Sequence, residues 1–250
     1  MSFDYSGTMW AAEKVRLTCG FLQALRLRWC LKDLEGVKGR VLELGCGAGG
    51  MVKAIKFYRP DLEVIGIDVN KEAIREAKKD DEGVEFMVMD AKKLRFKDKS
   101  FSAVVSFDVL EHIEDVKVVL KEAYRVLKQG GVFHNFVPLE RQGGTLYWFL
   151  KVFGWKGKKM AGHINVFDEK SLSRLLREAG FKIESKKFGN HCFYQLMDLI
   201  HHTSWQILGK RPVKQKPLGL IKTIVAPILY LESRLLAEVS GGAVSLGGVK

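Results

Sequence analysis

The chain has 250 residues, of which 47% are hydrophobic and 28% are charged, and its formal net charge is +12. This length is enough to bury a full hydrophobic core, and the ordinary composition excludes disorder over most of the chain. No uninterrupted apolar run reaches 18 residues and no basic region opens the sequence, so neither a membrane-spanning helix nor a signal peptide is expected.

The positive charge is concentrated in the second half of the chain. Residues 1–140 carry 23 Lys and Arg against 22 Asp and Glu, a net charge of +1. Residues 141–250 carry 18 against 7, a net charge of +11. This asymmetry indicates an anionic partner for the later residues, either a membrane surface or a nucleic acid. The alternative is a solvated basic surface that aids solubility.

The four cysteines indicate a reducing compartment and no metal. Cys19, Cys30, Cys46 and Cys192 form no C-x-x-C pair and no Cys/His cluster with zinc-binding spacing. A cytoplasmic location therefore fits best, with contact at the periphery of a membrane as a further expectation. No metal site is expected from the sequence, although a site formed by paired histidines among His191, His201 and His202 is the alternative.

The hydrophobic pattern predicts strands that alternate with helices. In chain order the expected elements are helix 10–34, strand 40–45, helix 49–58, strand 62–68, helix 70–79, strand 84–90, strand 101–108, helix 115–131, strand 132–138, helix 168–181 and strand 181–189. Such alternation is typical of an α/β fold with a doubly wound, mostly parallel sheet. A seventh strand is expected near 241–250, after a helical elaboration.

These elements suggest three parts in the chain. Residues 1–39 are expected to form an N-terminal helical cap, and residues 40–189 form the α/β core. Residues 190–250 are expected to be a basic, apolar and mostly helical elaboration that returns to the sheet as its last strand.

A glycine-rich segment, VLELGCGAGG, follows the first predicted strand. Gly45, Gly47 and Gly50 satisfy the pattern G-x-G-x-x-G, which also occurs at dinucleotide sites. Glu43 argues against a pyrophosphate, because its carboxylate would repel that group, and favours a ligand with an ammonium and a sulfonium. Asp68, Asp90 and Asp108 end three successive strands and are expected to face one crevice at the carboxyl edge of the sheet.

At this point the sequence resembles the class I S-adenosylmethionine-dependent methyltransferases, and most closely their small-molecule, quinone and lipid branch. The matching segments occur in family order over roughly residues 40–185, and as a set they are far more specific than the glycine loop alone. They are VLELGCGAGG, VIGIDVN, VEFMVMDAKKLRF, FSAVVSFDVLEHIED, LKEAYRVLKQGGVF and LLREAGFKIES. The resemblance implies a Rossmann-like core and S-adenosylmethionine as the cofactor.

The resemblance also implies roles for individual residues. Glu43, Gly45, Cys46 and Gly47 would surround the methionine part of the cofactor. Asp68 would bind both ribose hydroxyls, with Val69 against the adenine. Asp90 and Ala91 would read the adenine edge, and Phe107 would border the sulfonium.

Two histidines, His112 and His163, are candidates for the acceptor side of the site. His112 follows Glu111 just after the fourth strand, where it resembles the acidic residue–His pair common in the family, and it is the expected catalytic acid or base. A structural hydrogen bond is the alternative for this residue. His134 is expected to point into packing, whereas His163 is expected either beside the acceptor or at the surface. The N-terminal helix and residues 141–165 are candidates for a lid.

The expected acceptor is a hydrophobic small molecule or a lipid. Residues 141–250 hold 12 aromatic residues, and Lys151, Lys156, Lys158 and Lys159 are interleaved with the first of them. This pattern suits an anionic bilayer, and it also suits stacking on RNA. The apolar stretches 193–208 and 218–236 favour the lipid. One alternative is an RNA methyltransferase, which these stretches favour less than a lipid methyltransferase. The other alternative is a cofactor-binding protein without turnover.

Overall fold

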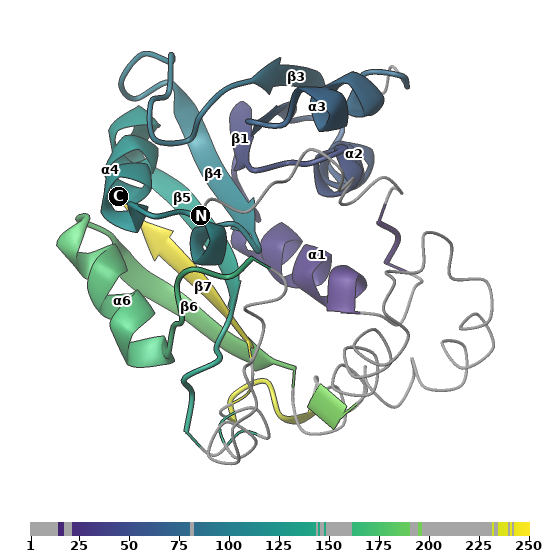
Figure 1. Cartoon of the computed structure of the whole chain (residues 1–250). Helices are drawn as coiled ribbons and strands as arrows, with labels where there is room; N and C mark the ends of the chain where they lie inside the picture. The colour runs from purple at the N-terminus through teal and green to yellow at the C-terminus, as the bar shows by residue number, and fades with distance from the viewer. Residues whose placement is uncertain are drawn as a thin grey trace.

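The computed structural model describes residues 15–17, 22–80, 83–143, 145, 148, 162–190, 195–196, 232, 235–239, 241 and 243–250. Their centre is a seven-stranded sheet with the strand order β3-β2-β1-β4-β5-β7-β6 (Figure 1). The strands are β1 (Arg40–Leu44), β2 (Glu63–Asp68), β3 (Glu85–Val88), β4 (Phe101–Phe107), β5 (Leu127–Pro138), β6 (Lys182–Gly189) and β7 (Ala243–Val249).

Parallel pairing joins five of the strands, and β7 alone is antiparallel to its two neighbours, β5 and β6. The chain builds outwards from β1 to β3, and then returns to place β4 on the other side of β1. Such a reversal creates a crevice at the carboxyl ends of the two central strands. The predicted doubly wound, mostly parallel sheet of seven strands is confirmed, including the strand expected near the C-terminus.

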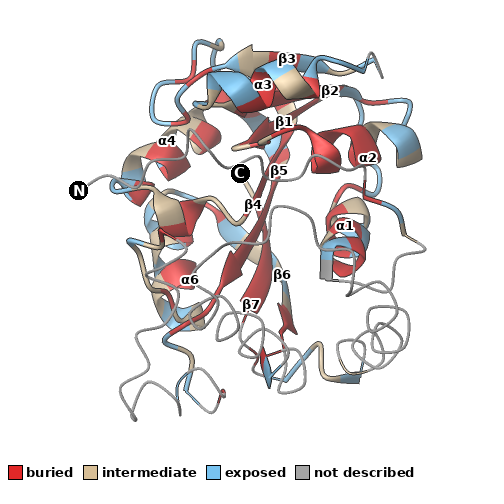
Figure 2. Ribbon diagram, turned by 45° about the vertical axis from the view of Figure 1, so that its right-hand side comes forward, coloured by how far each residue is buried: buried red, intermediate tan, exposed pale blue. Residues whose placement is uncertain are grey.

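Helices cover both faces of the sheet (Figures 1 and 2). Buried residues of α1 (Leu22–Asp33), α2 (Gly50–Tyr58) and α3 (Lys71–Ala77) pack in one hydrophobic cluster. Those of α4 (Val116–Val126) and α6 (Glu169–Glu178) pack in another. Because the central strands are buried on both sides, they read as nearly continuous apolar runs, which made them easy to predict.

The N-terminal helix is shorter than predicted. It was expected over 10–34, but α1 begins at Leu22, and residues 15–17 are not helical. The Val15 backbone N–H donates to the carbonyl of Gly50, and the Leu17 N–H donates to the Tyr58 hydroxyl. These bonds hold the segment on α2 and replace the bonds that a continuous helix would make; residues 1–14 and 18–21 lie outside the described part.

The helix predicted over 115–131 is also too long. α4 ends at Val126, and Leu127 is extended and pairs with Phe101 of β4. The next paired residue of β5 is Val132, so Lys128–Gly131 forms an irregular bend within the strand pairing. The pairing of Leu127 with β4 therefore takes the chain out of the helix. The helix ends four residues before Gly130, which was the expected stop.

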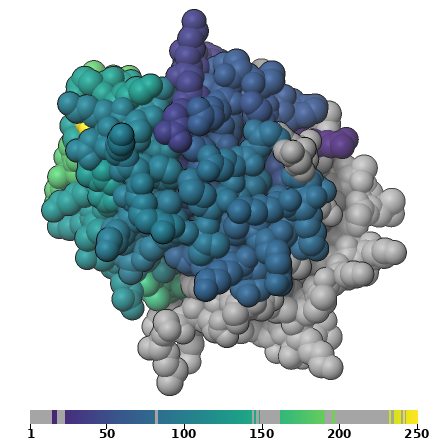
Figure 3. All heavy atoms as spheres, turned by 90° about the horizontal axis from the view of Figure 1, so that it is seen from above, coloured from purple at the N-terminus to yellow at the C-terminus, as the bar shows by residue number. Residues whose placement is uncertain are grey.

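Figure 3 shows one face of the molecule, over which the purple to teal part of the chain forms most of the described surface. No helix among the described residues has both the length and the apolar character needed to cross a membrane. Most of the candidate lid over 141–165 and of the expected elaboration over 190–250 lies outside the described residues.

Candidate functional site

The turn between β1 and α2 has a backbone that requires glycine. Gly45, Gly47 and Gly49 have φ angles of 67°, 53° and 86°, which non-glycine residues rarely adopt. A Cβ on Gly45 would also lie 2.5 Å from a methyl group of Val109, which follows β4. The turn thus packs against the end of β4, at the crevice between the two central strands.

The Asp68 carboxylate ties this turn to the end of β2. One carboxylate oxygen accepts the Gly47 N–H at 2.8 Å, and the other accepts the Asn70 N–H at 2.8 Å. Each oxygen retains a second lone pair, so the carboxylate can also accept hydrogen bonds from a bound diol. Asn70 in turn caps α3 by accepting the backbone N–H groups of Glu72 and Ala73.

Glu43 is a buried carboxyl group beside the turn. The residue is 3% exposed, and its Oε2 atom has no hydrogen-bond partner within the part of the chain that the structure describes. Burial, followed by the nearby charge of Asp68, raises the pKa of Glu43 to about 8. A cation held here would offset the cost of ionising the group. The site therefore fits a cationic ligand, whereas an anionic group such as a pyrophosphate would disfavour ionisation of Glu43 further.

Cys46 is a buried thiol within the turn. Its pKa is raised well above the usual range, first by burial and then by the charges of Glu43 and Asp68. The sulfur fills the space over Gly66 of β2, where a Cβ would lie 2.9 Å from it. A protonated, tightly packed thiol shapes the wall of the site and does not act as a nucleophile.

The residues expected at the adenine lie at the ends of β2 and β3. Val69 is 60% exposed, an unusual position for a valine that directly follows a buried strand. Asp90 accepts the Lys92 backbone N–H at 2.8 Å and remains half-exposed, and Ala91 is buried. Phe107 is nearly buried at the end of β4, with its ring centroid 5.4 Å from that of His134.

Asp108, the third acid at a strand end, has a different partner. Its carboxylate forms an ion pair with Arg26 of α1, whose guanidinium lies 4.3 Å from the centroid of the Phe136 ring. The Asp108 backbone has a φ angle of 53°, although its N–H still donates to the Phe136 carbonyl. This residue therefore connects α1 to the carboxyl end of β4.

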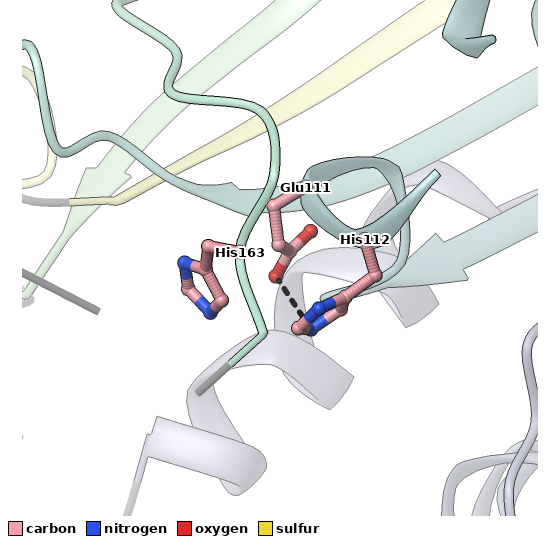
Figure 4. Close-up of side chains that lie close together, drawn as sticks. All are labelled: Glu111, His112 and His163. Carbon is pink, nitrogen blue, oxygen red and sulfur yellow. Dashed lines mark ion pairs between the residues drawn. The ribbon is translucent and has the colours of Figure 1, made fainter. Parts of the chain in front are cut away.

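A second group of side chains, which we call the Glu–His cluster, consists of Glu111, His112, Glu140 and His163. Glu111 and His112 belong to the short 3-10 helix η1 (Leu110–His112) after β4, and Glu140 follows β5. The imidazole rings of His112 and His163 are 4.8 Å apart and perpendicular. The Nδ1 of His163 is 2.5 Å from a Glu140 carboxylate oxygen. Figure 4 shows the Glu111 side chain extending between the two rings.

His112 is anchored as well as close to the crevice. Its Nδ1 is 3.1 Å from the carbonyl oxygen of Gly162, and its Nε2 is 3.9 Å from a carboxylate oxygen of Glu111. Burial lowers the pKa of His112, and the Gly162 contact only partly opposes that effect. The ring is thus neutral near pH 7, with the hydrogen on Nδ1, because the carbonyl can only accept.

Two further histidines, His134 and His163, lie in the described part of the chain. His134 is fully buried in β5, and its Nδ1 is 2.7 Å from a carboxylate oxygen of Asp33, so its predicted place in the packing is confirmed. His163 lies in the site, with 8% of its side chain exposed. Sequence reasoning missed Glu140 altogether, because nothing in the sequence links it to a histidine 23 residues later. His191, His201 and His202 lie outside the described residues.

Comparisons with known proteins agree on one family. The family described as "Methyltransferase domain" matches residues 42–134. The ubiquinone/menaquinone biosynthesis C-methyltransferase UbiE of Desulfotalea psychrophila is 31% identical over 60% of this chain and 69% of its own length. The demethylmenaquinone methyltransferase of Lactococcus lactis is 32% identical over 63% and 71%. Among solved structures, the phosphoethanolamine N-methyltransferase 2 of Haemonchus contortus, in complex with S-adenosyl-L-methionine, has a TM-score of 0.62 at 21% identity, covering 90% of this chain and 52% of that one.

Proposed function

Because this chain belongs to the class I S-adenosylmethionine-dependent methyltransferases, we propose that its acceptor is a lipophilic small molecule such as a quinone precursor or a lipid. Two relatives that the chain covers by more than two thirds are named for quinone methylation. The net charge of +11 over residues 141–250, with aromatic and lysine residues interleaved, supports an acceptor drawn from an anionic membrane.

The observation that carries the cofactor assignment is the buried carboxyl group of Glu43. S-adenosylmethionine supplies a methyl group on a positively charged sulfonium, next to an ammonium. We assign Glu43, Gly45, Cys46 and Gly47 to the methionine part of the cofactor. The positive charge of the cofactor would favour the ionised form of Glu43. The glycines would allow the backbone to approach the cofactor closely. Phe107, at the end of β4, would border the sulfonium.

The remaining assignments follow the strand ends. Asp68 would accept hydrogen bonds from the ribose hydroxyls, while its bonds to Gly47 and Asn70 fix its orientation. The exposed Val69 side chain would be covered by the adenine ring, whose amino group Asp90 would bind beside Ala91. Covering Val69 would remove apolar surface from water and so contribute to binding.

His112 stays our candidate for the acid–base residue of the acceptor. The neutral ring has its lone pair on Nε2, so it could accept a proton from an acceptor hydroxyl if the reaction needs one removed. Methyl transfer otherwise depends on alignment and on the exclusion of water, which are the tasks of the surrounding residues.

Calorimetry with the metal-free protein tests the cofactor assignment. S-adenosylmethionine should bind and NAD should not, because the pyrophosphate of NAD would meet the Glu43 carboxyl group. Glu43→Ala should reduce the affinity for S-adenosylmethionine, whereas Glu63→Ala, an exposed acid at the opposite end of β2, should not. Binding of NAD without binding of S-adenosylmethionine would refute the assignment.

Competition between vesicles and RNA tests the acceptor class. Co-sedimentation with vesicles should increase with their content of anionic lipid and decrease with salt, since salt screens each Lys or Arg contribution of about 1 kcal/mol. Neutral substitution of Lys151, Lys156, Lys158 and Lys159, which lie outside the described residues, should reduce it. Tight binding of single-stranded RNA, without vesicle binding at low salt, would favour an RNA acceptor. If neither binds, the basic region is only a solvated surface.

A further inference from the structure

The Glu–His cluster brings together three side chains of the types that bind transition metals. Glu111, His112 and His163 each offer one carboxylate oxygen or ring nitrogen, and these three atoms lie within 4.8 Å of one another. Two of the residues are adjacent in sequence and the third lies about fifty positions later, so only the fold joins them. Figure 4 shows the His163 ring beside the Glu111 side chain, with one of its two nitrogens on the far side of the ring from Glu111.

Both imidazole rings are held by a partner on Nδ1. His163 faces a carboxylate oxygen of Glu140 at 2.5 Å, and His112 faces the carbonyl oxygen of Gly162 at 3.1 Å. Because a carbonyl and an ionised carboxylate only accept, these contacts require a hydrogen on each Nδ1, which leaves Nε2 of each ring as the nitrogen that could bind an ion. Metal-binding histidines show this arrangement almost always, because the second partner fixes the tautomer and orients the ring.

The two halves of the cluster are also held together by the backbone. The N–H groups of Ile164 and Asn165 donate to the carbonyl oxygen of Glu111 at 2.9 and 3.0 Å. The Asn165 side chain donates to the carbonyl of Leu110 at 3.0 Å. His163 is therefore fixed beside η1 before any ligand binds, which lowers the entropic cost of assembling a three-residue site.

Burial makes the charge of a metal ion favourable in this position. Glu111 is 1% exposed, and the Glu140 and His163 side chains are 10% and 8% exposed. Two carboxyl groups thus lie in a medium of low polarity, where a nearby divalent cation would lower the cost of ionising them.

We propose that Glu111, His112 and His163 bind one divalent first-row transition metal ion, with Glu140 supporting His163 from behind. Two imidazoles with one carboxylate form a three-ligand set that leaves a coordination position open, as in catalytic zinc sites. Two nitrogen ligands favour zinc over magnesium. Ligands around a tetrahedral zinc are roughly 3.3 Å apart, so the side chains must close by about 1.5 Å at the widest pair.

The ion would face the acceptor side of the crevice, since η1 follows β4 directly. If the proposed function is correct, the open position could polarise an oxygen of the acceptor, and Nε2 of His112 would then bind the ion in place of accepting a proton. Metal binding itself does not depend on that function, so the two can fail separately.

Titration of the chelator-treated protein with Zn²⁺, without S-adenosylmethionine, tests the proposal. One ion should bind per chain, and Mg²⁺ should not compete at equal concentration. His163→Ala and Glu111→Gln should weaken zinc affinity by about 100-fold or more, and Glu140→Gln by about 10-fold. Glu114→Gln, an exposed acid three residues after Glu111, should leave the affinity unchanged. X-ray absorption of the zinc complex should show two imidazole ligands.

Two outcomes would overturn the proposal. One is the absence of stoichiometric zinc binding by the intact protein. The other is binding that survives in His163→Ala but is lost in the double variant H201A/H202A, because adjacent histidines elsewhere in the chain would then bind an adventitious ion only. Circular dichroism and S-adenosylmethionine affinity of each variant monitor the fold, and His163→Gln replaces any variant that does not fold. If zinc binds and S-adenosylmethionine does not, the metal site stands and the proposed function fails.

Discussion

Glu43 is the single side chain on which the proposed binding of a cationic cofactor depends most. A carboxyl group at 3% exposure beside Asp68 is costly to ionise, which is why its pKa is raised to about 8. The free protein therefore has this group mostly protonated at neutral pH. A bound sulfonium and ammonium would reverse that preference, so the same residue distinguishes a cationic ligand from an anionic one.

The shifted pKa of Glu43 predicts how stability changes with pH. The folded-state pKa of about 8 is above the unfolded value of about 4.5, so the folded state loses stability as pH rises between these values. The loss is about 1.4 kcal/mol for each pH unit at most. Glu43→Gln should remove this slope, leaving the variant more stable than the natural protein at pH 8 relative to pH 5. Denaturant unfolding at both pH values measures the difference, and identical slopes in the two proteins would contradict the assigned shift.

Asp68 carries the next prediction. Asp68→Ala should weaken the affinity for S-adenosylmethionine by roughly 2–4 kcal/mol, because charge-assisted hydrogen bonds to the ribose are lost. The loss of its bond to the Gly47 N–H should add to the effect by loosening the turn. Asp98→Ala is the matched control, because Asp98 lies before β4, at the opposite end of the strands. An unchanged dissociation constant in Asp68→Ala would mean that the crevice is misplaced.

At the scale of elements, the turn after β1 contributes to the site through the shape of its backbone. Gly45 meets Val109 closely, and Gly49 meets the Phe86 ring, so the turn is wedged between β4 and β3. The sequence indicated only that the glycines of this turn match the pattern of a nucleotide-binding site. The structure adds that glycine is also required by the protein's own packing, which a sequence motif cannot show.

Alanine substitutions at two glycines with similar φ angles would distinguish the cost of backbone strain from the cost of a steric clash. Gly36 and Gly45 have φ angles of 76° and 67°, but a Cβ on Gly36 would meet nothing within 4 Å. Gly36→Ala should cost about 1–2 kcal/mol of unfolding free energy, from strain alone. Gly45→Ala should cost more and should also weaken cofactor binding, since Val109 must move. Equal losses of stability, together with unaltered cofactor affinity, would show that the turn has room to adapt.

The sequence predicted some elements better than others for physical reasons. Strands β1 and β4 are buried on both faces and have continuous apolar runs, so their positions were predicted within about a residue. The end of α4 was wrong, because Leu127 still fits the helical pattern but pairs with Phe101 instead. Contacts between strands that are far apart in sequence override local preference, and periodicity does not encode them.

The same reasoning explains what could be predicted of the site. Asp68 was identified because the ends of adjacent parallel strands meet at one edge of a sheet, and Glu43 was identified from its charge two residues before the first glycine of the turn. The pairing of His163 with Glu140 could not be identified, since it depends on the path of the chain after β5. Asp108 was placed at the correct strand end, but its ion pair with Arg26 depends on how α1 packs across the sheet.

At the scale of the whole molecule, the fold separates two tasks. The residues that we assign to the cofactor lie at and after the carboxyl ends of β1 to β4, whereas the Glu–His cluster lies on η1, after β5 and before α6. Most of the net charge of +12 lies beyond residue 140 and therefore outside the cofactor half of the chain. Such a division would let the basic part hold a membrane surface while the core performs methyl transfer.

Transfer of a labelled methyl group tests the central claim most directly. The protein would be incubated with S-adenosylmethionine labelled in its methyl group, together with either a lipid extract or total RNA. We predict that the label enters the organic phase of the lipid reaction, that transfer falls strongly in Asp68→Ala, and that RNA remains unlabelled. Label in RNA but not in lipid would contradict the proposed acceptor. Binding of the cofactor without transfer to either fraction would contradict the claim that this chain methylates a lipophilic molecule.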